Sequence, residues 1–286
     1  MPQMWALRRY GVTLPTMPVA MINDLPLHYT DTGGTGPVLG HGYFLDHRIF
    51  AAQAHALNPW WRVVTWDARG HGATPDTAED TLYTYWDQAR DVLGLLDHLS
   101  VNQAVVGGVS QGGFIGLRVA LLAPQRVTGL VLWDTEATAC HPEDKTGYRR
   151  MFDALAEHGP IDELTGPLLT QLLGESDLRE GWREHWRGGA LPLGPAVGCL
   201  LDRDDVSDRL GEIGCPVLLM WGEHDISLPL NRMELLRDRL PQADRVHVID
   251  GAAHTPPLTH AEQVNVLLTE FLQRWASPPA GASSLV

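Results

Sequence analysis

Short, strongly apolar segments alternate with longer segments of helical periodicity over most of the chain. Most of the short segments are rich in β-branched or aliphatic residues at consecutive positions, which is typical of strands that a sheet buries on both faces. A hairpin is expected near the start, and Val38 with Leu39 predicts an unusually short strand. The segments interpreted as strands are residues 19–22, 27–29, 38–39, 62–66, 104–106, 130–133, 216–221 and 245–249.

Apolar residues at helical spacing lie between these strands. Residues 82–99 have one apolar face, whereas residues 114–123 are apolar almost all round and predict a deeply buried helix. In the last helix, Thr259 and Glu262 have the spacing of a capping box. Strands and helices that alternate in this way predict an α/β fold with a mainly parallel, doubly wound sheet.

The alternation stops between about residues 136 and 211, where no convincing strand pattern is present. The helical segments there are residues 148–158, 161–173 and 177–186. We therefore predict an α/β core of residues 1–136 and 212–276, with a helical cap of residues 137–211 inserted between two strands. Residues 277–286 are rich in Pro, Gly, Ala and Ser, have little to bury, and are expected to be disordered.

The charge balance argues against nucleic acid or an anionic membrane as a partner. Asp and Glu number 35 and Lys and Arg 21, so the formal net charge is −14, and no run of basic residues is present. No segment approaches the roughly 18 uninterrupted apolar residues of a membrane span, and no signal peptide is evident. Cys140, Cys199 and Cys215 are odd in number and widely spaced, so neither a disulfide framework nor a zinc site is indicated. We expect a cytoplasmic protein.

The most informative segment is Gly108-Val109-Ser110-Gln111-Gly112, which follows a predicted strand and precedes the predicted buried helix. This is the context of a nucleophile elbow, a sharp strand-to-helix turn that exposes a serine hydroxyl above the sheet. Only small residues fit two positions before and after that serine, because larger side chains would collide. The alternative is an ordinary glycine-rich turn that binds phosphate. We interpret Ser110 as the nucleophile.

A second loop, His41-Gly42-Tyr43, follows the short strand at Val38. In a hydrolase such a loop faces the elbow, so the backbone N–H groups of Tyr43 and Gln111 are candidate donors to the oxyanion of a tetrahedral intermediate. The alternative is that His41 and Gly42 only shape a turn.

No metal and no cofactor are expected. His41, Asp46 and His47 lack the middle histidine of an H-x-H-x-D-H motif and have a different spacing, and H-E-x-x-H is absent.

The candidate base is His254, which lies between the last predicted strand and the last helix. A loop at that position reaches across the edge of the sheet, and His254 completes the chain order Ser, acid, His. Two acids fit this order, because Asp225 and Asp134 each follow an apolar strand. Either carboxylate can accept the Nδ1 proton of His254 and fix its tautomer.

With these residues in place, the chain resembles the α/β-hydrolase superfamily, in its esterase and lipase branch, from about residue 19 to residue 275. The resemblance implies an eight-stranded, mostly parallel sheet with a helical cap after the sixth strand. It also implies Asp225 as the acid, after the seventh strand, although some members carry the acid after the sixth, where Asp134 stands. A serine nucleophile disfavours the epoxide hydrolases and haloalkane dehalogenases of this fold, which use aspartate. The motifs that carry the resemblance are His41-Gly42-Tyr43, Asp67-Ala68-Arg69-Gly70-His71-Gly72, Gly108–Gly112, Gly222-Glu223-His224-Asp225 and Gly251–His254.

The expected activity is hydrolysis of a small apolar or aromatic carboxylic ester through an acyl-enzyme intermediate. Lactone, amide or carbon–carbon bond hydrolysis by the same residues is the alternative within enzymes, and a non-catalytic binding protein on this scaffold is the alternative outside them. Trp182 and Trp186 in the cap are candidates for substrate binding, or they pack the cap onto the core.

Overall fold

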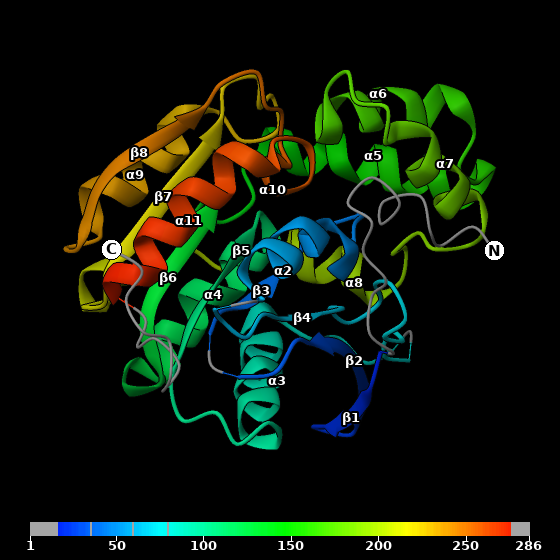
Figure 1. Cartoon of the computed structure of the whole chain (residues 1–286). Coiled ribbons are helices and arrows are strands. Elements are labelled where there is room, and N and C mark those ends of the chain that lie inside the picture. The colour runs from blue at the N-terminus through cyan, green and yellow to red at the C-terminus, as the bar shows by residue number, and fades with distance from the viewer. Residues whose placement is uncertain (1–16, 35, 59, 79, 276–286) are drawn as a thin grey trace.

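The computed structural model describes residues 17–34, 36–58, 60–78 and 80–275. The segment 277–286, which the sequence predicts to be disordered, lies outside the described residues. A central sheet of eight strands carries helices on both faces (Figure 1).

The strands follow the spatial order β1-β2-β4-β3-β5-β6-β7-β8. Strand β2 is antiparallel to both of its neighbours, β1 and β4, and the remaining neighbours in the sheet pair in parallel. The predicted doubly wound, mostly parallel sheet is therefore confirmed, and each segment interpreted as a strand belongs to it. The bounds are β1 Val19–Ile22, β2 Leu25–Asp31, β3 Val38–Gly40, β4 Val64–Trp66, β5 Ala104–Val109, β6 Val127–Trp133, β7 Val217–Gly222 and β8 Ala243–Ile249.

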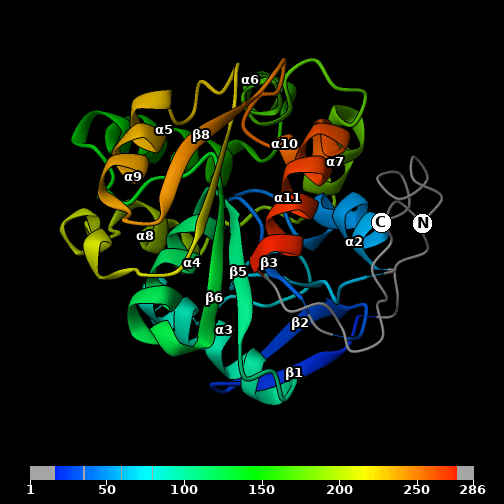
Figure 2. The same cartoon turned by 60° about the vertical axis from the view of Figure 1, so that its left-hand side comes forward.

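Helices cover the sheet on two sides, with α2 and α11 on one face and α3, α4 and α9 on the other (Figure 2). Helix α4 begins directly after Ser110 and buries every residue from Gln111 to Ala120, as its all-round apolar sequence predicts. These helices are α2 Ala51–Leu57, α3 Tyr85–His98, α4 Gln111–Leu122, α9 Leu230–Arg239, α10 Pro256–Thr259 and α11 Ala261–Trp275, with 3-10 turns η2 His47–Phe50 and η3 Pro124–Arg126.

The capping box predicted at Thr259 is wrong. Thr259 ends the short helix α10, and its hydroxyl contacts the backbone oxygen of Thr255 and the ring of His260. Pro256 and Pro257 begin this separate turn because proline is favoured in the first turn of a helix. The long helix α11 therefore begins only at Ala261.

The chain between β6 and β7 contains helices and no strand. We call the chain from α5 to η4 the cap segment. Its longer helices α5, α6 and α7 gather over one end of the sheet (Figure 1), whereas α8 was not predicted, because its proline and glycine weaken the helical pattern. The extent of a separable cap domain stays a prediction. The elements are α5 Pro142–His158, α6 Asp162–Leu173, α7 Arg179–Arg187, α8 Pro195–Leu201 and η4 Ser207–Glu212.

All three cysteines are free thiols, with Cys140 and Cys199 buried. Within the described ranges, no helix has the length and hydropathy needed to cross a lipid bilayer.

Candidate active site

The turn between β5 and α4 is a sharp elbow with Ser110 at its tip. Ser110 has φ of +52° and ψ of −113°, a conformation that residues with a side chain rarely adopt. A Cβ atom on either Gly108 or Gly112 would lie 2.1 Å from the backbone oxygen of Gly40 on the neighbouring strand. Only glycine fits these two positions, which is the requirement that the sequence pattern predicts.

The elbow is held by hydrogen bonds to the end of β6. The amide of Ser110 donates to the backbone oxygen of Trp133 over 3.0 Å, and the hydroxyl of Thr135 donates to the backbone oxygen of Ser110 over 2.7 Å. The Oγ of Ser110 has no hydrogen-bond partner in the described part of the chain. The hydroxyl is thus free to react while the backbone that carries it is fixed.

His254 lines the same cavity as Ser110, and its other ring edge is bound to Asp225. The distance from His254 Nδ1 to Asp225 Oδ2 is 2.9 Å, and both side chains are buried. The second oxygen, Asp225 Oδ1, accepts the backbone amides of Ser227 (2.7 Å) and Leu228 (3.2 Å). These bonds fix the carboxylate, so Nδ1 is occupied and Nε2 is the ring nitrogen left for proton transfer.

Asp134 lies next to this pair without taking the place of Asp225. Its Oδ1 accepts the amide of Gly222 over 2.8 Å, and its Oδ2 is buried without a hydrogen-bond partner. One potential ligand atom from each of Asp134, Asp225 and His254 lies within 4.8 Å of the others. Burial first, and then the charge of Asp225, raise the pKa of Asp134 well above its ordinary value of 3.8. Asp134 therefore holds its proton more tightly than an ordinary aspartic acid.

Asp134→Asn is expected to raise stability relative to the wild type as the pH increases above about 4. In the unfolded chain the carboxyl loses its proton near pH 3.8, whereas in the fold it keeps it to a much higher pH. The contribution of Asp134 to stability is thus fully present below the unfolded pKa and is lost as the pH rises through the folded pKa. Urea unfolding between pH 4 and pH 9 measures this, and parallel curves for the two proteins would contradict it.

The loop after β3 packs directly against the elbow. A Cβ atom on Gly42 would lie 3.7 Å from the Cβ of Ser110. Gln111 is the first residue of α4, so its amide has no acceptor within the helix. In the described part of the chain neither this amide nor that of Tyr43 has a hydrogen-bond acceptor. Two such amides beside a serine hydroxyl form an arrangement that can stabilise an oxyanion.

His41 holds this loop in place through hydrogen bonds of its side chain. From the sequence alone, its alternative role was only to shape a turn. Its Nε2 accepts the amide of Ala68 over 2.9 Å, so the proton is on Nδ1, which donates to the backbone oxygen of Gly42 over 2.8 Å. Burial lowers the pKa of His41 and lowers that of its neighbour His71 to about 3. Both rings are thus neutral supports for the loop rather than charged groups.

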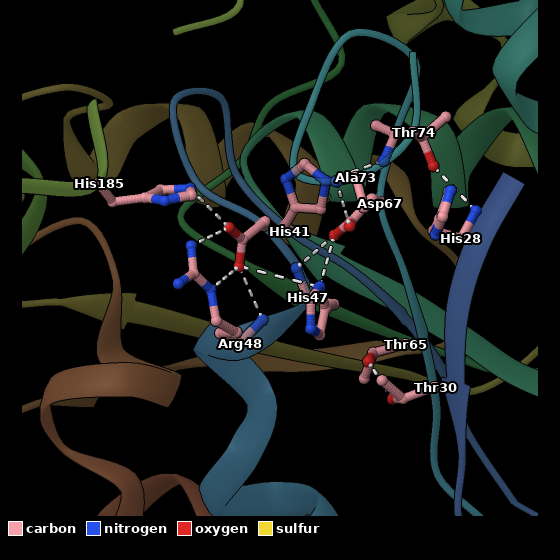
Figure 3. A network of polar contacts seen from close by, with 12 residues as sticks. His28, Thr30, His41, His47, Arg48, Thr65, Asp67, Ala73, Thr74 and His185 are labelled. Carbon is pink, nitrogen blue, oxygen red and sulfur yellow. Dashed lines mark hydrogen bonds and ion pairs between the residues drawn. The ribbon is translucent and has the colours of Figure 1, made fainter. Parts of the chain in front are cut away.

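A buried polar network extends from the same loop to the cap segment (Figure 3). Asp46 accepts Nε of Arg48 over 2.8 Å and lies 3.2 Å from Nε2 of His185 on α7. Asp67 accepts both the backbone amide and Nδ1 of His47, over 2.9 Å and 2.7 Å. Asp46, His47 and Asp67 could together hold a metal ion by geometry. Protein donors already occupy the carboxylates, so we assign the network to structure.

The cavity around Ser110 and His254 has a volume of about 50 Å³, and side chains of the cap segment form much of its wall. Three polar side chains of that wall, Tyr148, Gln171 and Arg203, were not identified from the sequence, which contains no motif around them. The other lining residues are Tyr43, Phe44, Phe114, Leu168, Leu172, Leu200, Ser227 and Leu228.

A larger cleft of about 620 Å³ lies beside this cavity, between the end of α6 and the loops that follow β7 and β8. Its lining includes Ala253 but neither Ser110 nor His254. We therefore take the smaller cavity, which contains Ser110 and His254, as the candidate active site.

Trp182 and Trp186 do not line either of these cavities, so their candidate role in substrate binding stays a prediction without support from the cavity lining. Both are fully buried between α7 and the loop after β3. Trp186 Nε1 donates to the backbone oxygen of Phe44 over 2.8 Å, and the guanidinium of Arg48 lies 5.0 Å from the ring of Trp182. The two tryptophans therefore fasten the cap segment to the core, the alternative that the sequence left open.

Trp186→Ala is expected to lower the free energy of unfolding by about 3–5 kcal/mol, because a buried ring and its hydrogen bond are lost together. Activity on short and long esters is expected to fall by the same factor, since the ring does not contact the cavity. Urea unfolding and kcat/KM for ethyl acetate, butanoate and hexanoate measure both effects. A changed preference for acyl chain length would instead indicate that Trp186 contributes to substrate binding.

Comparisons with known proteins agree with this fold. A family model described as alpha/beta hydrolase fold matches residues 38–261. The dihydrolipoyllysine-residue acetyltransferase component of the acetoin cleaving system of Pseudomonas putida is 33% identical over 254 residues, which cover 85% of this chain and 64% of that protein. A pimeloyl-[acyl-carrier protein] methyl ester esterase from Nitrosomonas europaea is 29% identical over 252 residues, which cover 82% and 95%. A solved thermophilic esterase from Thermogutta terrifontis, with malate bound, has a TM-score of 0.80 and 28% identity, covering 93% and 100%.

Proposed function

The chain belongs to the α/β-hydrolase family, and from that membership and the site geometry we propose that it is a serine hydrolase of small carboxylic esters. Hydrolase activity is supported by the fold and by the esterases among its relatives. Cleavage of a carboxylic ester by Ser110, His254 and Asp225 is our proposal, as is the cytoplasm as its location. No cofactor is required by this chemistry.

The observation that carries the proposal is the hydrogen bond between His254 and Asp225 in the cavity that also contains the Ser110 elbow. The bond leaves Nε2 of His254 as the base that accepts the proton of Ser110. A glycine-rich turn that binds phosphate has no need of a buried histidine and carboxylate beside it. A ligand receptor on the same scaffold has no need of all three groups either.

In the proposed reaction, Ser110 Oγ attacks the ester carbonyl carbon while His254 takes its proton. The amides of Tyr43 and Gln111 donate to the oxyanion of the tetrahedral intermediate, where charge develops. The C–O bond to the alcohol then breaks, and His254 returns the proton to the leaving oxygen. Water, deprotonated by His254, attacks the acyl-enzyme and releases the carboxylic acid and free Ser110.

The cavity volume limits the substrate. Pockets for drug-sized ligands occupy about 300–1,000 Å³, whereas the cavity at Ser110 measures about 50 Å³. A short acyl group is therefore the best fit. Lactones are the second candidate, because a lactone presents the same acyl carbonyl in a compact ring.

Turnover of short and long p-nitrophenyl esters, with a panel of lactones beside them, tests the proposal. A burst of p-nitrophenolate followed by slower steady release would support an acyl-enzyme intermediate. Acetyl and butanoyl esters are expected to react faster than decanoyl esters. Binding of esters and lactones without any turnover would instead favour a receptor.

A further inference from the structure

The wall of the cavity opposite the sheet carries a buried cation that the proposed ester hydrolysis does not use. Arg203 follows α8 and lines the same cavity as Ser110 and His254. Its side chain is 5% exposed, and its guanidinium lies 4.8 Å from the ring of Phe114. A buried arginine is uncommon unless it is paired, so its partners determine what it can do.

Arg203 and Arg232 share one carboxylate. Arg203 Nη2 donates to Glu136 Oε1 over 2.5 Å, and Arg232 Nη1 lies 3.6 Å from Glu136 Oε2. Two guanidinium groups against one carboxylate leave a net charge of one positive unit in this cluster, of which Arg203 is the member that lines the cavity. The neighbouring Asp144 is exposed to solvent, where its charge is screened.

Arg203 also has N–H groups that are not used by the hydrogen bonds to its oxygen acceptors. A guanidinium has five N–H groups. In Arg203, Nε donates to the backbone oxygen of Thr138, Nη1 to that of Leu200, and Nη2 to Glu136. One N–H on each terminal nitrogen has no oxygen acceptor among the described residues, and the thiol of Cys140 also lies close to this guanidinium.

Two further polar groups line this wall. Tyr148 and Gln171 line the cavity, and neither the Tyr148 hydroxyl nor the Gln171 side-chain amide has a hydrogen-bond partner in the described ranges. Burial raises the pKa of Tyr148 to about 12, against the opposing effect of Arg203, so the hydroxyl is close to the cation and keeps its proton. The wall thus combines the buried guanidinium of Arg203 with two half-buried side chains that can donate hydrogen bonds.

We propose that this wall is a subsite for the terminal carboxylate of a short acyl chain, with Arg203 as the specificity-determining residue and Tyr148 and Gln171 as further donors. This inference rests on the proposed ester hydrolysis and names its substrate class, the half-esters of short dicarboxylic acids. A guanidinium matches a carboxylate with two parallel hydrogen bonds. A purely apolar acyl chain would offer the buried guanidinium of Arg203 no acceptor for its remaining N–H groups.

The competing explanation is that Arg203 only stabilises the fold. It joins Glu136 at the end of β6 to the backbone of Thr138 and Leu200. Removing a group with only that role lowers activity on every substrate by the same factor. A carboxylate subsite instead predicts a loss confined to substrates with a charged end, so matched substrate pairs separate the two.

The test compares monoethyl glutarate with ethyl 5-methylhexanoate, in which an isopropyl group replaces the carboxylate. Wild-type kcat/KM is expected to be roughly 10- to 100-fold higher for the glutarate ester, the range that hydrogen bonds to a charged group support. The double variant Arg203→Gln/Glu136→Gln is used because Arg203→Gln alone leaves Glu136 buried without its closest partner. It is expected to lose that preference mainly through KM, with the isopropyl ester within about threefold of the wild type.

Arg209→Gln/Glu212→Gln, an exposed pair on η4, is the matched control and is expected to keep the wild-type preference. Monoethyl succinate and adipate, with their own isopropyl analogues, extend the comparison to shorter and longer chains. Equal losses on both members of each pair, or no wild-type preference at any length, would overturn the subsite while ester hydrolysis stands. If no ester of either kind is hydrolysed, the proposed function fails and the subsite fails with it.

Discussion

Ser110→Ala is expected to lower kcat for ester hydrolysis by about six orders of magnitude, with the fold intact. The substitution removes the proposed nucleophile, so His254 has no hydroxyl to deprotonate and the amides of Tyr43 and Gln111 have no oxyanion to stabilise. The elbow itself should persist. Its hydrogen bonds to Trp133 and Thr135 use only the backbone of Ser110, and alanine accepts the same φ with the strain of any residue that has a Cβ. Steady-state kinetics and thermal unfolding measure the two halves of this expectation.

Ser227→Ala is the matched control, because Ser227 lines the same cavity and its Oγ is buried without a hydrogen-bond partner. The contact that Ser227 makes to Asp225 uses its backbone amide, which the substitution keeps. We expect this variant to retain activity within a few-fold. Near-wild-type turnover by Ser110→Ala, or an equal loss of kcat in both variants, would show that Ser110 is not the nucleophile.

Asp225→Asn is expected to lower kcat by about 10⁴, the loss seen when the acid of a Ser-His-Asp triad is replaced by its amide. An amide facing Nδ1 stabilises the wrong tautomer of His254 and cannot balance the imidazolium charge that forms during attack. The two backbone amides that Asp225 accepts would also lose a charged partner. The kcat of the variant, compared with its thermal unfolding, separates this chemical loss from a structural one.

Asp134→Asn is expected to change kcat by no more than a few-fold, because His254 binds Asp225 rather than Asp134 and an amide resembles the carboxyl group of Asp134 in shape. The proximity of Asp134 also has a consequence for Asp225→Asn. Without the charge of Asp225 beside it, Asp134 ionises more easily and can partly replace the lost carboxylate. The double variant is therefore expected to lose more activity than Asp225→Asn alone. A larger loss of kcat in Asp134→Asn than in Asp225→Asn would indicate that Asp134, after β6, is the acid that orients His254.

The elbow and the sheet could be predicted because each leaves a recognisable pattern in a short stretch of sequence. The collisions that exclude side chains at Gly108 and Gly112 are with the backbone of Gly40 on another strand, but the five-residue pattern of the elbow is enough to indicate them. Strands buried on both faces are recognisable by their apolar runs. Even β3, with three residues, belongs to the sheet where the pattern placed it.

The cavity wall could not be predicted, because it is formed by contacts between distant segments. Arg203 has no motif, and only its position beside Glu136, 67 residues earlier, shows that it is buried and paired. The sequence marked Trp182 and Trp186 as large apolar groups in the cap. It did not indicate that α7 turns both of them toward the loop after β3 rather than toward Ser110.

The choice between the two acids was also beyond the sequence, since both follow an apolar strand in the correct chain order. The hydrogen bond from His254 to Asp225 separates them geometrically. The high pKa of Asp134 adds a second distinction, which arises from burial beside another carboxylate. Chain order alone contains neither of these facts.

Labelling with a fluorophosphonate, followed by mass mapping of the proteolytic peptides, tests the central claim most directly. The reagent forms a covalent bond with an activated serine, so the account predicts one adduct per chain, located on Ser110, with activity lost in proportion to labelling. His254→Ala is expected to prevent the reaction, because an unactivated hydroxyl is a weak nucleophile. An adduct on another residue, or full activity in chains labelled at Ser110, would contradict the account.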